Sequence, residues 1–186
     1  MISLDRKKLK QENSEKLNRE NFRVLMECMS RPGKVDQLEP LSGSTVSAVA
    51  SALLYQEVTW CNMTSDDLSD IAFTTGSKEA QLADADYIFA NEPSVDVLTV
   101  VGRGTYESPE LGGTIFFRCE TLDVNKYILT GPGINKRIEV SLPINREFAE
   151  AFKVVNSKFP TGVDVFFIDD QNRITALART TKLELV

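Results

Sequence analysis

The second half of the chain carries five apolar segments of strand length, and their order restricts the possible folds more than any other feature. They read TIFFRC (114–119), KYILT (126–130), KRIEVSLP (136–143), GVDVFFI (162–168) and RITALAR (173–179). Between the third and fourth lies NREFAEAFKVVNSKFP, where Phe148, Ala151, Phe152 and Val155 fall on one helical face. The pattern predicts strands with one amphipathic helix inserted, and a closing hairpin through residues 169–172.

The first half reads mostly as helix. Phe22, Leu25, Met26 and Met29 form one apolar stripe, which Ser30-Arg31-Pro32-Gly33 ends. Further predicted elements are a helix from Ser44 or Thr45, a strand at 58–61, a short helix at 65–73, a strand at 86–90 and an ambiguous segment, favoured as helix, at 95–101. Helices that come early and between strands predict a three-layer α/β domain with a mixed sheet.

The length of 186 residues suggests a single domain. We expect residues 16–186 to form a single α/β unit and residues 1–15 to be a flexible leader. The leader carries a small basic cluster, Arg6, Lys7, Lys8 and Lys10, which acidic neighbours dilute. No apolar run reaches the ~18 residues of a membrane span, and no signal peptide is recognisable, so we expect a cytoplasmic protein without a membrane partner.

Charge and composition exclude several function classes. The net charge is −6 and the pI about 4.8, which argues against nucleic acid as a partner. The chain has no histidine, so triads built on histidine and histidine metal sites are excluded. Its three cysteines, Cys28, Cys61 and Cys119, form no C-x-x-C pair, which argues against disulfides and structural zinc. We expect no metal.

The segment TGPG (130–133) could be a phosphate-binding loop or a turn between two strands. A phosphate-binding loop needs inward N–H groups and a following helix, but Pro132 removes one donor and a strand pattern follows. Gly131 and Gly133 therefore predict a turn between strands. A role in ligand binding stays open because Lys136 and Arg137 lie beside the loop.

Two other segments could contact an anion. VGRGTYESPELGGT (101–114) is glycine-rich and offers Arg103 as an anion contact, although a surface connection with turn glycines is the favoured interpretation. ARTT (178–181) offers Arg179 and Thr180 to an anion; the alternative is an edge strand with a salt-bridged arginine. Taken from the residues alone, the candidate ligand-binding set is Arg103, Gly131, Gly133, Lys136, Arg137, Arg179 and Thr180, with no catalytic residue assigned.

Several motifs, taken together, resemble a known family. FRVLMECMSRPG (22–33), ESPELGGTIFF (107–117), LTGPGI (129–134), FPTGVDVFFI (159–168) and ARTT occur in an order and spacing similar to the PhnH family, a subunit of the bacterial carbon–phosphorus lyase system. The resemblance runs from about residue 20 to the C-terminus. Ala178 departs from the proline that the family commonly has before Arg-Thr-Thr, which puts the local turn geometry in doubt.

The resemblance implies a fold and a function. The fold would be similar to a reduced large domain of pyridoxal-phosphate-dependent transferases, and the protein would form homodimers. It would act as an accessory subunit beside other carbon–phosphorus lyase subunits, in the step that couples a phosphonate to the ribose of ATP with release of adenine. No cofactor is expected, because neither Lys126 nor Lys136 is marked as a Schiff-base lysine. The alternatives are a stand-alone phosphonate- or nucleotide-binding protein and, less favoured without a histidine base, an enzyme of unknown class.

Overall fold

A computed structural model describes residues 2–186, with side chains from Ser14 onward. The helices are α1 Ile2–Ser30, α2 Thr45–Leu53, α3 Ser69–Thr75, α4 Val95–Val100 and α5 Arg146–Val155, with a 3-10 turn at Pro109–Leu111. The strands are β1 Asp36–Gln37, β2 Thr59–Met63, β3 Lys78–Glu79, β4 Tyr87–Ala90, β5 Thr114–Cys119, β6 Asn125–Thr130, β7 Ile138–Leu142, β8 Asp164–Asp169, β9 Arg173–Leu177 and β10 Lys182–Leu185.

Two sheets organise the described part of the chain. The larger has seven strands in the order β1-β9-β8-β5-β4-β2-β3, and the smaller has the order β10-β6-β7. In the larger sheet β3, β2, β4, β5 and β8 run parallel, β9 pairs antiparallel with β8, and β1 pairs antiparallel with β9. The predicted mixed α/β sheet is therefore confirmed, as is the hairpin between β8 and β9.

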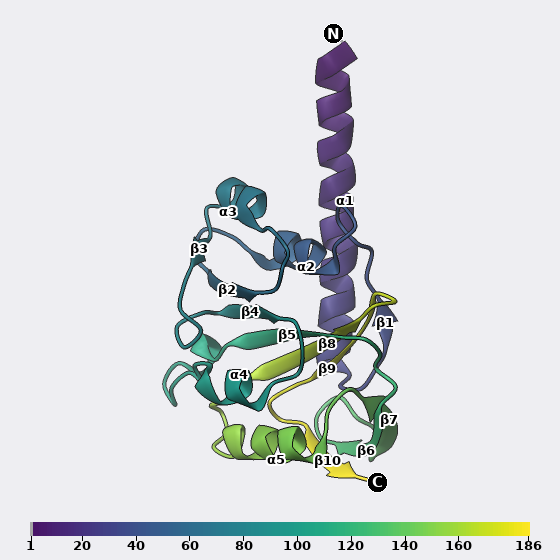
Figure 1. Ribbon diagram of the computed structural model, residues 1–186, viewed down its shortest axis with the longest axis vertical. Helices are drawn as coiled ribbons and strands as arrows, with labels where there is room; N and C mark the ends of the chain where they lie inside the picture. Colours follow the sequence, from purple (N-terminus) through teal and green to yellow (C-terminus); the bar gives the residue numbers. More distant parts are fainter. Residues whose placement is uncertain (1) are drawn as a thin grey trace.

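The central strands are buried on both faces, which explains their continuous apolar sequences. In β5, Ile115 and Phe117 point into one core, whereas Phe116 points into the other. One core lies beneath α1, α2 and α3, and the second lies beneath α4, α5 and the smaller sheet. Figure 1 shows these layers on the two sides of the central sheet, which gives the predicted three-layer arrangement.

Local signals set most helix ends as predicted. Ser44 and Asn145 cap α2 and α5, each accepting a hydrogen bond from the N–H three residues on. The ambiguous segment at 95–101 is helix α4, capped by Ser94. The predicted helix start at residue 65 is wrong: α3 begins at Ser69, because Thr64 and Asp66 are held in a hydrogen-bonded loop with Asn62.

Helix α1 begins at Ile2, inside the stretch predicted as a flexible leader. The side chains of residues 1–13, including the basic cluster of Arg6, Lys7, Lys8 and Lys10, lie outside the described side chains. The flexibility of residues 1–15 and the single-domain boundary at residue 16 therefore stay predictions. In the described residues, no helix is both long enough and apolar enough to cross a membrane.

Candidate functional site

The parallel strands place their carboxyl ends along one edge of the larger sheet. The connection after β2 leads to α3 on one face, while the connection after β4 leads to α4 on the other face. The chain therefore leaves the neighbouring parallel strands β2 and β4 toward opposite faces of the sheet. In α/β sheets the carboxyl edge near such a change of face is the usual place for ligands.

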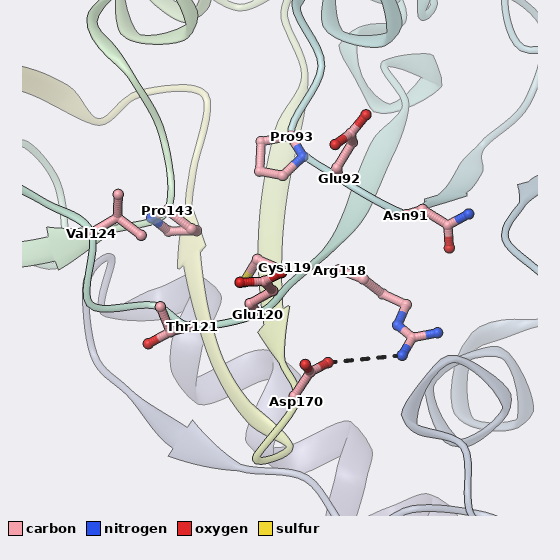
Figure 2. Close-up of a pocket in the computed structure, with 10 residues that line it drawn as sticks. All are labelled: Asn91, Glu92, Pro93, Arg118, Cys119, Glu120, Thr121, Val124, Pro143 and Asp170. Carbon is pink, nitrogen blue, oxygen red and sulfur yellow. Dashed lines mark ion pairs between the residues drawn. The ribbon is translucent and has the colours of Figure 1, made fainter.

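A pocket of about 540 Å³ lies at this edge. Its lining comes from the last residues of β5 and the segments that directly follow β4, β5 and β8, together with the end of the small sheet. The lining residues are Asn91, Glu92, Pro93, Arg118, Cys119, Glu120, Thr121, Val124, Pro143 and Asp170. Figure 2 shows Arg118 and Asp170 pointing toward one another, with Asn91 and Glu92 across the opening. The volume is within the range of small-molecule sites.

Arg118 supplies the positive charge in the lining of this pocket, and its ion pairs with neighbouring carboxylates are long. Its Nη1 lies 3.6 Å from Asp66 Oδ2, and its Nη2 lies 4.0 Å from Asp170 Oδ1. Its side chain remains 39% exposed. Because both ion pairs are long, neither locks the guanidinium as a bidentate pair would, and it keeps N–H donors for a ligand.

The carboxylate of Asp66 is fixed by its own loop. Thr64 donates its hydroxyl to Asn62 Oδ1 at 2.8 Å and contacts Asp66 Oδ2 at 3.2 Å, while Asn62 Nδ2 donates to the Asp66 carbonyl at 2.7 Å. Asp66, Arg118 and Asp170 line a smaller cavity of about 180 Å³, which shares Arg118 and Asp170 with the first pocket. Arg118 thus lines both cavities.

A second arginine holds the pocket wall in place. Buried Asp169 accepts the Nε–H of Arg173 at 2.7 Å and the backbone N–H groups of Gln171 and Arg173. Arg173 also donates to Asp123 at 3.0 Å, which ties the β8–β9 turn to the loop after β5. Hydrogen bonds to Asp169 and then Asp123 raise the pKa of Arg173. Arg173 is thus a structural link.

The cysteine of the pocket is a poor nucleophile. Burial, reinforced by the nearby Asp169 and Asp170, raises the pKa of Cys119 to about 12. Its Sγ donates to the Ile168 carbonyl at 3.5 Å. At neutral pH the reactive thiolate is therefore suppressed. The pocket offers a guanidinium, an amide and several carboxylates, which suits recognition of a ligand that carries an anion and hydroxyl groups.

The TGPG loop joins β6 to β7, so its interpretation as a strand-to-strand turn is confirmed. Gly131 and Gly133 have φ values of 136° and 80°. A side chain at Gly131 would meet the Thr180 carbonyl, and one at Gly133 would collide with the Ser30 carbonyl. Lys136 and Arg137 are exposed beside the turn. Ligand binding by these residues stays a prediction.

Arg179 connects three loops at the opposite, amino edge of the parallel strands. It pairs with Asp164 through Nε and Nη2 at 3.0 and 2.6 Å. Its remaining N–H groups reach the carbonyls of Pro109, Gly112 and Pro160. All five guanidinium N–H groups thus have acceptors, which favours the salt-bridge interpretation over a direct anion contact.

The predicted ligand-binding residues do not form one cluster. The Arg103 carbonyl reaches the Arg179 region by accepting the Gly162 N–H at 2.9 Å, but the Arg103 side chain is exposed and donates a hydrogen bond to the Thr99 carbonyl at 3.5 Å. Thr180 packs on Gly131. None of the seven lines the pocket at the carboxyl edge.

Sequence reasoning missed Arg118, Asp66, Asp170, Asn91 and Glu92. A usable signal was present, since each follows or ends an apolar strand segment. The sequence identifies the strands but not their parallel order, so it does not place these residues together. Among the residues that the structure describes, no group of three or more histidine, cysteine or acidic side chains could hold a metal ion.

Comparison with known proteins gives two matches. The family model described as bacterial phosphonate metabolism protein (PhnH) matches residues 11–184. The chain is also similar to the alpha-D-ribose 1-methylphosphonate 5-triphosphate synthase subunit PhnH of Rhizobium meliloti (strain 1021), with 28% identity over 179 residues and 88% of each chain covered.

Proposed function

The chain belongs to the family of the bacterial phosphonate metabolism protein PhnH, and on that premise we propose that it is an accessory subunit of the carbon–phosphorus lyase system. It supports the step that couples a phosphonate to the ribose of ATP with release of adenine. The extent of the family match carries this proposal, because it spans almost the whole chain and both sheets.

The subunit contributes binding surface and not the reacting groups. Two observations support this division of labour: the sequence has no histidine to act as a general base near neutral pH, and the pocket thiol has a pKa of about 12. The carboxyl-edge pocket with Arg118 is the surface we assign to ligand or partner recognition within the complex.

The fold is a reduced version of the large domain of pyridoxal-phosphate-dependent transferases, without the cofactor. Its mainly parallel seven-stranded sheet with helices on both faces supports this assignment. The protein acts in the cytoplasm as a homodimer that joins the other subunits. The relative's printed name, a synthase subunit, supports the multi-subunit assembly.

Assembly is tested by co-purification. The tagged chain is expressed with the other subunits in phosphate-starved cells that lack the native gene, and growth on methylphosphonate as phosphorus source is followed. We expect recovery of the subunits with the tag and restored growth. Arg118→Ala is compared with Lys126→Ala, an exposed lysine outside the pocket. Purification of the chain alone, with growth restored all the same, contradicts the accessory role.

A second function, stand-alone ligand binding, is favoured by the loosely paired Arg118 in a ligand-sized pocket. Thermal melting of the isolated chain with ATP or methylphosphonate separates the two functions. Ligand at 100 times its dissociation constant stabilises by about 2.7 kcal/mol, so binding is readily seen. The accessory role predicts no shift. A shift lost in Arg118→Ala supports the second function, and one lost in Lys136→Ala with Arg137→Ala assigns the site to the TGPG loop.

A further inference from the structure

Three large apolar side chains are exposed on two loops at the amino edge of the larger sheet. Tyr106 and Leu111, on the loop that follows α4, are 80% and 59% exposed. Phe159, on the loop that follows α5, is 70% exposed. An exposed apolar side chain that stands alone is normal, but several gathered on one face mark a surface that contacts another molecule.

One arginine holds these two loops together, so the three side chains belong to one face. Arg179 Nη1 donates to the Pro109 carbonyl at 2.7 Å and to the Pro160 carbonyl at 3.5 Å. Leu111 lies two residues after Pro109, and Phe159 directly precedes Pro160. Because the loops are anchored at these points, their apolar side chains need little further ordering when another molecule covers them.

A pocket adjoins Phe159, between α5 and β10, which lie side by side in Figure 1. Its volume is about 580 Å³. It is lined by Lys153, Asn156, Ser157, Phe159, Arg179, Thr180, Thr181, Lys182, Leu183 and Glu184. The exposed members of that lining are Lys153, Ser157, Phe159, Lys182 and Glu184. Arg179 also bonds the loop that carries Tyr106, so the pocket and that loop are neighbours on one face. Neither the family match nor the relative's printed name assigns this face a role.

The loop and the pocket carry opposite charges. Within residues 105–111 the charged side chains are Glu107 and Glu110, and both are exposed. Lys158, beside Phe159, and Lys182, in the pocket lining, are exposed as well. Among the side chains of residues 14–186, none of these four takes part in an ion pair. The acidic loop and the basic rim of the pocket therefore complement one another in charge.

This complementarity points to a second copy of the chain as the occupant of the face. A two-fold rotation sets the loop of each copy on the pocket of the other, so every contact occurs twice. The chain carries a net charge of −6, so two copies repel one another unless basic groups gather where they meet. An aromatic side chain buries about 150–250 Å², so the Tyr106 and Phe159 rings of two copies supply a large part of the roughly 1,200–2,000 Å² that a stable interface buries.

We propose that the homodimer forms through this face, with residues 105–111 of each copy set on the pocket between α5 and β10 of the other. Tyr106 packs on Phe159 of the other copy, and the acidic loop faces the exposed lysines of the pocket rim. The inference rests on the proposed dimer and adds where the two copies meet. The carboxyl-edge pocket lies at the opposite edge of the parallel strands, so this dimer leaves it free for recognition.

Sedimentation of the full-length chain tests this interface. Tyr106→Glu and Phe159→Glu each place a charge in the apolar contact and should raise the dimer dissociation constant about tenfold or more. Phe73→Glu is the matched control and should leave it unchanged, because Phe73 is 91% exposed on α3, outside this face. A dimer that persists equally in all three variants overturns this interface and leaves the dimer itself standing. An unaltered chain that sediments as a monomer overturns both.

An exchange of charges identifies which surfaces meet. Glu107→Lys with Glu110→Lys makes the loop basic, and Lys158→Glu with Lys182→Glu makes the pocket rim acidic; all four positions are exposed, so the fold is retained. Each double variant alone should be largely monomeric, because like charges face one another. An equimolar mixture should dimerise again, since each loop then faces a rim of opposite charge. Dimers of either variant alone, or a mixture that stays monomeric, contradict the loop-to-pocket arrangement.

Discussion

At the scale of single residues, burial decides between a ligand contact and a core role. Phe152 lies in the apolar stripe of α5 and is fully buried in the core beneath α4, α5 and the small sheet, so its predicted core role is confirmed. The exposed neighbour Val154, two positions along, points away from that core. One helix thus offers both a buried and an exposed apolar side chain.

Phe152→Ala should lower the free energy of unfolding by roughly 3–5 kcal/mol, because burial is lost and a cavity remains. Val154→Ala is the matched control and should change it little. Urea unfolding followed by circular dichroism measures both. Equal denaturation midpoints for the two variants would contradict the core assignment of Phe152.

The glycine of the TGPG turn tests backbone geometry. Gly133 has φ 80°, and a Cβ there would collide with the Ser30 carbonyl at the end of α1. Gly43 has a similar φ of 87° but nothing within 4 Å of its Cβ position. Alanine at either position should cost about 1–2 kcal/mol of backbone strain, and only Gly133→Ala adds a clash with the Ser30 carbonyl. Melting temperatures should therefore fall further for Gly133→Ala; the reverse order contradicts the geometry.

At the scale of elements, one ion pair holds the amino edge of the sheet together. Arg179 follows β9, Asp164 begins β8, and the bonds of Arg179 reach the loops at 109–112 and 160. The two side chains are only 16% and 18% exposed, so the pair is well shielded from solvent. Lysine cannot reproduce the planar set of donors.

Arg179→Lys should destabilise the protein by about 3 kcal/mol and loosen both loops, since carbonyls lose their donors. Limited proteolysis should then cut within residues 103–112 or 157–162 first. Lys126→Gln, in the exposed pair with Glu139, serves as control and should leave stability and cleavage unchanged. Resistance of Arg179→Lys to cleavage at these loops would show that the pair is not their anchor.

At the scale of the whole molecule, the buried thiol of Cys28 and the half-buried thiol of Cys119 make stability depend on pH in the alkaline range. Burial raises the pKa of Cys28 and of Cys119 from 9.0 to about 12. Since the folded pKa values exceed the unfolded ones, the unfolded chain releases protons first. The stabilising contribution is complete below about pH 9 and is lost as pH rises toward 12.

The urea midpoint should therefore fall between neutral pH and about pH 10, and the fall should be smaller in Cys28→Ala. The quantity to compare is the change of the urea midpoint with pH, because the midpoint at a single pH also reflects the packing lost in the variant. An identical slope in both proteins would show that Cys28 titrates normally in the folded state.

Association is the second molecular property to test. A homodimer would sediment at about twice the 20.7 kDa chain mass at micromolar concentration. A stable interface buries on the order of 1,200–2,000 Å² in total. Sedimentation as a monomer throughout that concentration range would contradict the proposed dimer.

The sequence by itself determined nearly all the main elements. Periodicity located α1, α5 and the strands of the second half, since apolar spacing follows directly from the geometry of each element. Ser44 and Asn145 marked helix starts because capping is a local interaction. The short strands β1 and β3 were not predicted, because two residues carry no period.

Only the tertiary structure decided where the pockets lie. Arg118, Asp66 and Asp170 come from segments more than fifty residues apart, and strand order alone brings them to one edge. The side-chain atoms Asn156 Nδ2 and Thr181 Oγ1 are buried without a hydrogen-bond partner in the described structure, and the sequence does not show this either, because it depends on the surrounding atoms. Local propensity fixes elements within a few residues, whereas a site depends on contacts that close over long loops.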